Sequence, residues 1–293
     1  MERIELRQER DFSEKFNATF NFIKLNFKSY LWVMLVLIAP IMVLQSLGMN
    51  VFQGYLTNYM AELNFQSGGI SNGEMMSNLF TIYMVVLVFA LVFYSWMQTV
   101  VMSYIKLYLD GNDQISIGAV AGLALRKFPK ILGVTLLIGF ISILGFVLCI
   151  LPGIYLSISL IMVSFIVFFE GDPVFEAFSR SFKLIKNKWW STFGLMFVVS
   201  FIVGIMAIIF AVPQYIVTFV SVFNGEMPYN SVPYNITSAI TGVGMGLLYP
   251  LIYIALAFQY FNLVERNESQ GLKNLIDNAA NQPKIDNVNQ GEY

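Results

Sequence analysis

Charged residues are absent from five long stretches of this chain. No Asp, Glu, Lys or Arg occurs in 29–61, 75–105, 131–169, 189–225 or 227–264. A helix needs about 20 apolar residues to cross the ~30 Å hydrocarbon layer of a bilayer, so each stretch can hold a transmembrane helix. Stretch 131–169 is nearly twice that length and is interrupted by Pro152 and Gly153, so it can hold two that form a tight hairpin. The pattern therefore predicts six transmembrane helices.

Composition supports a membrane fold. Only 12% of the residues are charged, about half of the ~25% that is typical of soluble domains. We expect an all-α integral membrane protein in three parts. These are a cytoplasmic lead-in and interfacial helix at 1–28, a six-span membrane domain at 29–264, and a polar cytoplasmic tail at 265–293 with one helical turn at 272–276.

Apolar runs set the limits of the spans, and the aromatic, Gly/Ser-rich and PYN-rich segments 50–77 and 223–235 are expected to be loops. The predicted spans are about Tyr30–Met49, Leu79–Leu109, Ile131–Ile150, Gly153–Phe169, Trp189–Val212 and Thr237–Val264. Kinks or helix ends are expected at the prolines within these spans, Pro40, Pro213 and Pro250. Small residues four apart, Ser238, Gly242 and Gly246, predict a face where two helices pack closely.

Positive charge is confined to one side of the predicted spans. All 17 Lys and Arg residues lie before the first span, between the second and third, between the fourth and fifth, or after the sixth. Cytoplasmic connections of membrane proteins are enriched in Lys and Arg. We therefore expect a multi-pass protein of the cytoplasmic (inner) membrane with both termini in the cytoplasm.

Two segments on the predicted cytoplasmic side carry large apolar residues at the same spacing of 4, 4, 3 and 4. The first stripe is Phe12, Phe16, Phe20, Ile23 and Phe27, and the second is Val174, Phe178, Phe182, Ile185 and Trp189. Such spacing places each set on one helical face, which is typical of a helix lying in the membrane interface. The alternative is an ordinary helix that faces the core of a cytoplasmic domain.

These two segments also predict an internal repeat. A shift of 162 residues superimposes Glu14, Phe16, Phe20, Ile23, Lys24 and Ser29 on Glu176, Phe178, Phe182, Ile185, Lys186 and Ser191. Residues 110–130 follow the same theme of an acidic turn and a helix. We interpret the chain as three units, each an amphipathic interfacial helix followed by a transmembrane hairpin. The alternative is chance similarity between two Phe-rich helices.

The most specific site prediction lies in the second amphipathic segment. Glu176 and Arg180 are four residues apart, in the order that favours a helical ion pair. The bases near the expected headgroup layer could hold an anionic lipid phosphate, each contributing about 1 kcal/mol. They are Arg180, Lys183, Lys186 and Lys188. Generic anchoring of the membrane topology is the favoured alternative.

The block LPGIYL … FFEGDPVFEAFSRSFKLIKNKWW resembles the membrane domain found in glycerophosphoryl diester phosphodiesterases and in related uncharacterised six-span bacterial proteins. The residues that carry the resemblance are Pro152, Gly153, Glu170, Glu176, Arg180, Ser181 and Trp189. The resemblance is good over 151–194, and elsewhere only the predicted membrane topology is similar. In those enzymes a soluble catalytic domain follows the membrane domain, whereas here only residues 265–293 follow. The resemblance therefore implies a membrane-domain fold without phosphodiesterase activity.

The residue types that the sequence lacks limit the chemistry that we expect. The chain has no His and a single Cys, Cys149, so Cys clusters and imidazole ligands for a metal are excluded. The end of the helix Leu79–Leu109, which carries Lys106, is expected to protrude from the bilayer. The membrane-embedded parts of the spans carry no ionisable residue of the kind that proton- or ion-driven transporters use. We expect no catalytic residue, metal or cofactor, no nucleic-acid partner, and contact with membrane lipid and possible protein partners.

The function predicted from these features is that of a non-catalytic integral membrane protein, acting in envelope or lipid homeostasis or as a scaffold for partners. The alternative is a transporter or channel for a neutral or lipidic solute, in which Gln98, Gln259 and the proline kinks would line or gate the path. A membrane enzyme is the weakest option, because Cys149 and the scattered serines have no neighbouring base.

Overall fold

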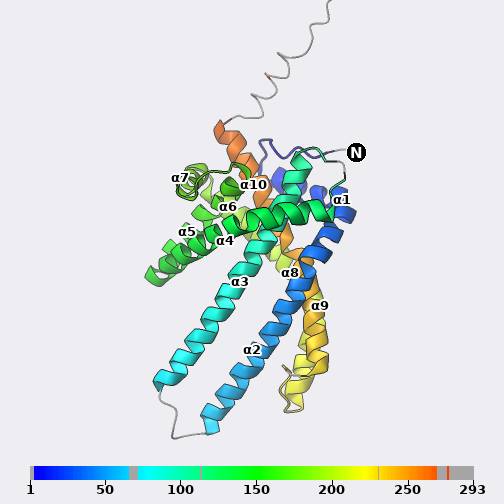
Figure 1. Cartoon of the computed structure of the whole chain (residues 1–293), viewed down its shortest axis with the longest axis vertical. Coiled ribbons are helices and arrows are strands. Elements are labelled where there is room, and N and C mark those ends of the chain that lie inside the picture. The colour runs from blue at the N-terminus through cyan, green and yellow to red at the C-terminus, as the bar shows by residue number, and fades with distance from the viewer. Residues whose placement is uncertain (1–2, 66–71, 113, 230, 269–275, 277–293) are drawn as a thin grey trace, which may run out of the picture.

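The structure is a computed structural model that describes residues 3–65, 72–112, 114–229, 231–268 and 276 (Figure 1). Within these residues the chain forms ten helices and no strand. The helices are α1 (Phe12–Leu37), α2 (Ala39–Phe65), α3 (Asn72–Leu109), α4 (Ile117–Leu148), α5 (Ile150–Leu160), α6 (Val163–Phe169), α7 (Val174–Ile185), α8 (Trp189–Phe223), α9 (Val232–Leu248) and α10 (Pro250–Glu268). The predicted tail lies outside the described residues from 269 on, apart from residue 276.

Five helical segments are long and apolar enough to cross a membrane, and a sixth is counted when the bent pair α1–α2 is taken as one span. The five are Phe80–Leu109, Ile117–Leu148, Ile150–Phe169, Trp189–Phe223 and Val232–Glu268. Each corresponds to one predicted span, and the bent pair corresponds to the first. The predicted all-α, multi-span membrane fold is confirmed.

The first span is broken where Pro40 was expected to kink it. Helices α1 and α2 meet at Ile38 and are bent by 42°. Pro40 has no N–H to donate to the preceding turn, which weakens the helix at this point. The indole Nε1 of Trp96 donates a 2.9 Å hydrogen bond to the carbonyl of Leu37 and so ties α3 to the break.

Helices run further than the sequence predicted at both expected loops and at Pro213. Helix α2 continues to Phe65 and α3 begins at Asn72, so most of the predicted loop 50–77 is helical. These residues include no proline, and extending a formed helix costs far less than starting one. Helix α8 likewise continues through Pro213 to Phe223, and only the residues between Phe223 and Val232 form a connection.

The hairpin α4–α5 turns at Cys149, three residues before the predicted Pro152. Cys149 has an extended backbone (φ −172°, ψ 155°), while Pro152 and Gly153 lie in the first turn of α5. Proline is tolerated there because the N–H groups of the first turn have no partner within the helix. Helix α4 is continuous from Ile117, so the middle unit has no separate amphipathic helix.

Two glycines let the backbones of α4 and α5 approach closely. A Cβ added to Gly145 would lie 3.0 Å from Cα of Gly153. We expect Gly145→Val to push the helices apart and destabilise the protein by about 1–3 kcal/mol. The fraction of protein that stays folded after heating in detergent, measured by size-exclusion chromatography, reports this loss. Gly204→Val in α8 is the matched control, because a Cβ there meets nothing within 4 Å. Equal losses in both variants would contradict the close approach.

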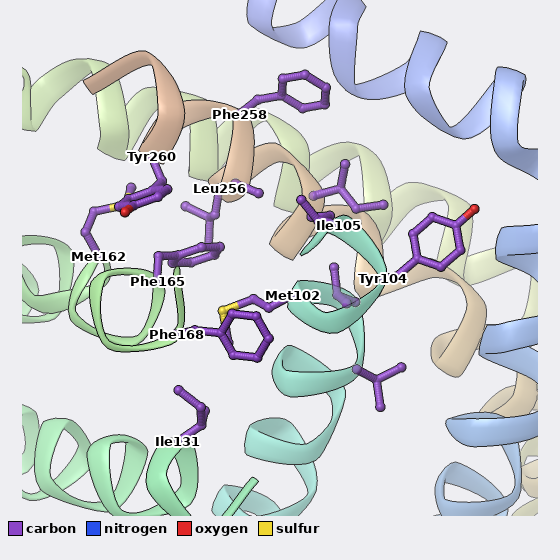
Figure 2. Close-up of a cluster of buried hydrophobic side chains, with 14 of the residues drawn as sticks. Met102, Tyr104, Ile105, Ile131, Met162, Phe165, Phe168, Leu256, Phe258 and Tyr260 are labelled. Atoms are coloured by element: carbon purple, nitrogen blue, oxygen red, sulfur yellow. The ribbon is translucent and has the colours of Figure 1, made fainter. Parts of the chain in front are cut away.

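Helix α10 forms the centre of one end of the molecule, which we call the packed end. Nearly every residue of α10 from Ile254 to Glu265 is buried. Figure 2 shows its side chains among those of α3, α4 and α6. The ring of Phe165 stacks on Tyr260 at 5.8 Å, and Phe22 from α1 meets Phe258 edge-on at 5.9 Å.

Away from the packed end, α2 packs mainly against α9 and α8 also packs against α9. The predicted small-residue face is confirmed at the contact between α2 and α9. A Cβ added to Gly242 would lie 3.0 Å from the carbonyl oxygen of Met42, and one added to Gly246 would lie 3.0 Å from the Met42 side chain. In Figure 1, α2, α3 and α9 extend from the packed end in one direction, while the α4–α5 hairpin extends to the left.

The base-bearing segments meet at the packed end. The N-terminal segment, α7 and the end of α10 lie together there (Figure 1). Arg3 donates to the carbonyl of Gly111 at 2.8 Å, and Lys130 donates to the carbonyl of Gly171 at 3.1 Å. These contacts agree with the prediction that the segments share one side of the membrane. The assignment of this side of the membrane to the cytoplasm stays a prediction.

Candidate functional site

Helix α7 is held against the protein by one face and exposes the opposite one. The chain leaves α6 through Gly171, whose φ of +85° is a left-handed conformation that glycine adopts without strain. Pro173 then precedes the first residue of α7. The buried face consists of Ala177, Ser181, Leu184 and Ile185. The hydroxyl of Ser181 donates a 2.7 Å hydrogen bond to the carbonyl of Ser159, which fixes α7 to α5.

The predicted aromatic stripe of α7 lies at the edge of the buried face rather than at its centre. Val174, Phe178 and Trp189 are only half-buried, and Phe182 is exposed. Phe175, beside the stripe, is 84% exposed. A helix that packs one face on protein and also presents aromatic rings outward has access to both protein and lipid. The stripe residue Ile185 belongs to the buried face, so part of the stripe packs on protein, and the interfacial location of α7 stays a prediction.

Helix α1 buries the equivalent positions. Lys15, Thr19 and Phe22 are buried, and the 162-residue shift superimposes them on Ala177, Ser181 and Leu184. The stripe residues Phe12 and Phe27 are 42% and 57% exposed. The agreement of buried positions fits the proposed repeat, which stays a prediction. The continuations differ, since α1 runs on through Tyr30 to Leu37 whereas α7 ends at Ile185.

A groove between α5 and α7 brings three of the predicted site residues together. Its volume is about 230 Å³. Lys183 and Lys186 line it from α7, and Trp189 lines it from the start of α8. The remaining lining residues are Tyr155, Ser159, Phe182 and Ile185. The groove thus combines two exposed cations with a mostly apolar and aromatic wall.

The aromatic wall of this groove is well ordered by direct contacts. The rings of Tyr155 and Trp189 stack at 5.9 Å with an interplanar angle of 19°. The indole Nε1 of Trp189 donates to the carbonyl of Tyr155 at 3.3 Å. Trp189 also stacks on Phe193 one turn further along α8, at 5.4 Å. These contacts join α5 and α8 at the groove.

Arg180 occupies a different environment from the lysines. Its Nε lies 2.6 Å from Oε2 of Glu170, and its Nη2 lies 2.5 Å from Oε1 of Glu268. The hydroxyl of Tyr260 donates to the other oxygen of Glu170 at 2.5 Å. Burial lowers the pKa of Arg180, but the two carboxylates outweigh burial, so its pKa is raised above the ordinary value. We call these four residues the Arg180 cluster.

The Arg180 cluster revises part of the predicted site. Arg180 directs both of its ion pairs across to Glu170 and Glu268, so the predicted helical pair with Glu176 is wrong for the ion pairs that the structure describes. Glu176 is exposed, and Lys188 is half-buried outside the groove lining. Among the four predicted lipid-binding bases, Lys183 and Lys186 are therefore the two placed to meet a ligand in the groove.

A buried lysine was missed by the sequence analysis. Lys15 is 3% exposed; its Nζ donates to Oε1 of Gln259 at 2.7 Å and to the hydroxyl of Ser191 at 3.2 Å. Nε2 of Gln259 donates in turn to Thr192 at 2.8 Å. Gln259 therefore joins α10 to α1 and α8 through hydrogen bonds. A signal was available, because Lys15 lies four and seven residues before Thr19 and Phe22, on one helical face.

Comparison of the chain with protein-family models, curated proteins and solved structures finds no match. The fold and the contacts described above identify a helical multi-span membrane protein.

Proposed function

We propose that this is a non-catalytic integral membrane protein of the cytoplasmic membrane that binds an anionic phospholipid and acts in envelope or lipid homeostasis. The observation that carries the proposal is the α5–α7 groove, which is lined both by Lys183 and Lys186 and by the stacked rings of Tyr155 and Trp189. A phospholipid needs both a cationic site for its phosphate and an apolar surface for its acyl chains, and the groove offers both.

The Arg180 cluster supports this proposal by fixing the position of α7. Arg180 joins α7 to Glu170 at the end of α6 and to Glu268 at the end of α10. Ion pairs that are partly shielded from water hold their geometry better than fully exposed ones. Lys183 and Lys186 therefore project from a rigid helix, which reduces the entropy lost when a ligand binds.

Exposed aromatic residues around the groove support a location at the membrane boundary. Trp190 is 77% exposed and Phe175 is 84% exposed, both close in sequence to the lysines. Trp rings are enriched at the boundary between lipid and water, and Lys side chains extend from apolar surfaces to reach the headgroups. The positive-inside distribution of Lys and Arg supports a position of this boundary at the inner leaflet. The resemblance of 151–194 to phosphodiesterase membrane domains fits a lipid-related role.

The proposal predicts a lipid preference that depends on two lysines. We expect Lys183→Gln/Lys186→Gln to weaken the binding of phosphatidylglycerol, relative to phosphatidylcholine, roughly 10- to 30-fold, since each base contributes about 1 kcal/mol. Native mass spectrometry of the whole protein, released from mixed micelles with each lipid, measures the bound fraction. Added salt should weaken phosphatidylglycerol binding in the wild type.

Lys24→Gln/Arg126→Gln is the matched control, because it removes two exposed cations that lie outside the groove. It should retain the preference for phosphatidylglycerol. An equal loss of phosphatidylglycerol binding in both double variants would mean that lipid binding depends on net charge alone, and the groove proposal would then be rejected. No preference in the wild-type protein would reject it as well.

A further inference from the structure

A second cavity lies between α2 and α9, on the side of the molecule away from α7. Its volume is about 230 Å³, and helices α3 and α8 complete its wall. Uncharged polar side chains reach it from all four helices, and they include Gln45, Asn50 and Gln53 of α2, Tyr94 of α3, Gln214 of α8 and Ser238 of α9. Methionines and a second tyrosine, Tyr249, supply the apolar part of the wall.

The polar residues of α2 form a continuous face. Gln45 and Gln53 are eight residues apart and Ser46 and Asn50 are four apart, which places them on adjacent rows of one side of the helix. Nδ2 of Asn50 donates to Oδ1 of Asn235 at 2.9 Å, and the hydroxyl of Ser238 donates to Oδ1 of Asn50 at 3.1 Å. Part of this polar face is therefore satisfied by α9 and joins the two helices.

Gln45 is not satisfied in this way. Its Oε1 is buried and accepts no hydrogen bond from the described residues. An unpaired polar atom inside a membrane span costs free energy, because lipid offers it no donor. Gln45 lines the cavity, so a ligand hydroxyl in the cavity would meet this acceptor.

The lining determines what kind of ligand fits. Amides and hydroxyls both donate and accept hydrogen bonds, as polyols also do. A charged ligand would find no countercharge in the lining, since none of the lining residues is Asp, Glu, Lys or Arg. The volume lies below the ~300–1,000 Å³ typical of sites for drug-sized ligands, so the ligand is small. We propose that the cavity between α2 and α9 is a binding site for a small neutral polyol. This site is independent of the α5–α7 groove.

The site can be tested with glycerol and myo-inositol as probes. Saturation-transfer NMR on the whole protein in nanodiscs of neutral lipid should show signal transfer to both polyols and none to glycerol 3-phosphate. Gln45→Leu and Gln53→Leu should each weaken polyol binding roughly 3- to 10-fold, the effect of one lost hydrogen bond. Gln98→Leu is the control, because Gln98 is an amide within a span that does not line the cavity.

Thermal stability separates a ligand site from a structural amide. Because Oε1 of Gln45 has no hydrogen-bond partner within the described part of the chain, Gln45→Leu should leave the unfolding temperature unchanged or raise it while polyol binding is lost. Absence of transfer to either polyol in the wild type would overturn the proposal. So would Gln45→Leu and Gln53→Leu variants that bind polyols as the wild type does, or transfer to glycerol 3-phosphate as strong as that to glycerol.

Discussion

Arg180→Gln is expected to destabilise the folded protein by at least about 2 kcal/mol. The substitution removes the cation between Glu170 and Glu268, so two carboxylates that are only 23% and 28% exposed lose their ion pair with Arg180. Removing one member of a fully buried pair costs about 3–5 kcal/mol. The Arg180 cluster is partly exposed, so we expect a loss below this range, of about 2 kcal/mol. Thermal unfolding in detergent, with limited proteolysis of α10, measures the loss.

Two further variants show whether the loss comes from the cluster. Lys183→Gln removes an exposed cation from the same helix and should leave stability unchanged. Arg180→Gln/Glu170→Gln should be less destabilised than the sum of the two single variants, because it removes the charge that Arg180→Gln leaves unpaired. Additive losses in this cycle would show that Arg180 and Glu170 do not interact.

Cys149 gives an all-or-none test of the membrane topology. It is the only cysteine of the chain and it is exposed at the turn between α4 and α5. If both termini are cytoplasmic, this turn faces outward, and a membrane-impermeant maleimide should label Cys149 in intact spheroplasts. Cys149→Ser should remain unlabelled.

The opposite side can be probed in the same background. Asn112→Cys in Cys149→Ser introduces a single exposed thiol just after α3, which the charge distribution places in the cytoplasm. We expect this thiol to be labelled only after lysis. The reverse pattern, with Asn112→Cys labelled in intact spheroplasts and Cys149 protected, would invert the predicted topology.

The spans could be predicted from sequence because the cost of placing charge in lipid acts on each segment separately. The uncharged stretches located the five candidate spans, and the bent pair α1–α2 that can be counted as a sixth, without reference to tertiary contacts. Helix limits were predicted less well. The segment around Tyr55 has the composition of a loop, but a helix that has already formed continues through it. The turn at Cys149 was misplaced because Pro152 is equally compatible with the first turn of a helix.

The sites depend on contacts that no local pattern encodes. Lys183 and Lys186 could be proposed from their charge, but the groove exists only because α5 lies beside α7. Arg180 carries the same charge and has a different role, which was hidden because its partner Glu268 is far away in the chain. The polyol cavity was missed because Gln45 and Asn50 are uncharged, and the polar contacts of Asn50 come from α9, more than 180 residues later.

The central position of α10 has a consequence for biosynthesis. Lys15 must wait for its partner Gln259, which follows 244 residues later. At about 5–20 residues per second, translation of that interval takes roughly 10–50 s. Ser191, the other acceptor of Lys15, follows after 176 residues, so for most of this time Lys15 has neither of its two partners. The packed end therefore closes as one late event, and a nascent chain that stalls before Pro250 leaves that cation and the Arg180 cluster open to membrane proteases.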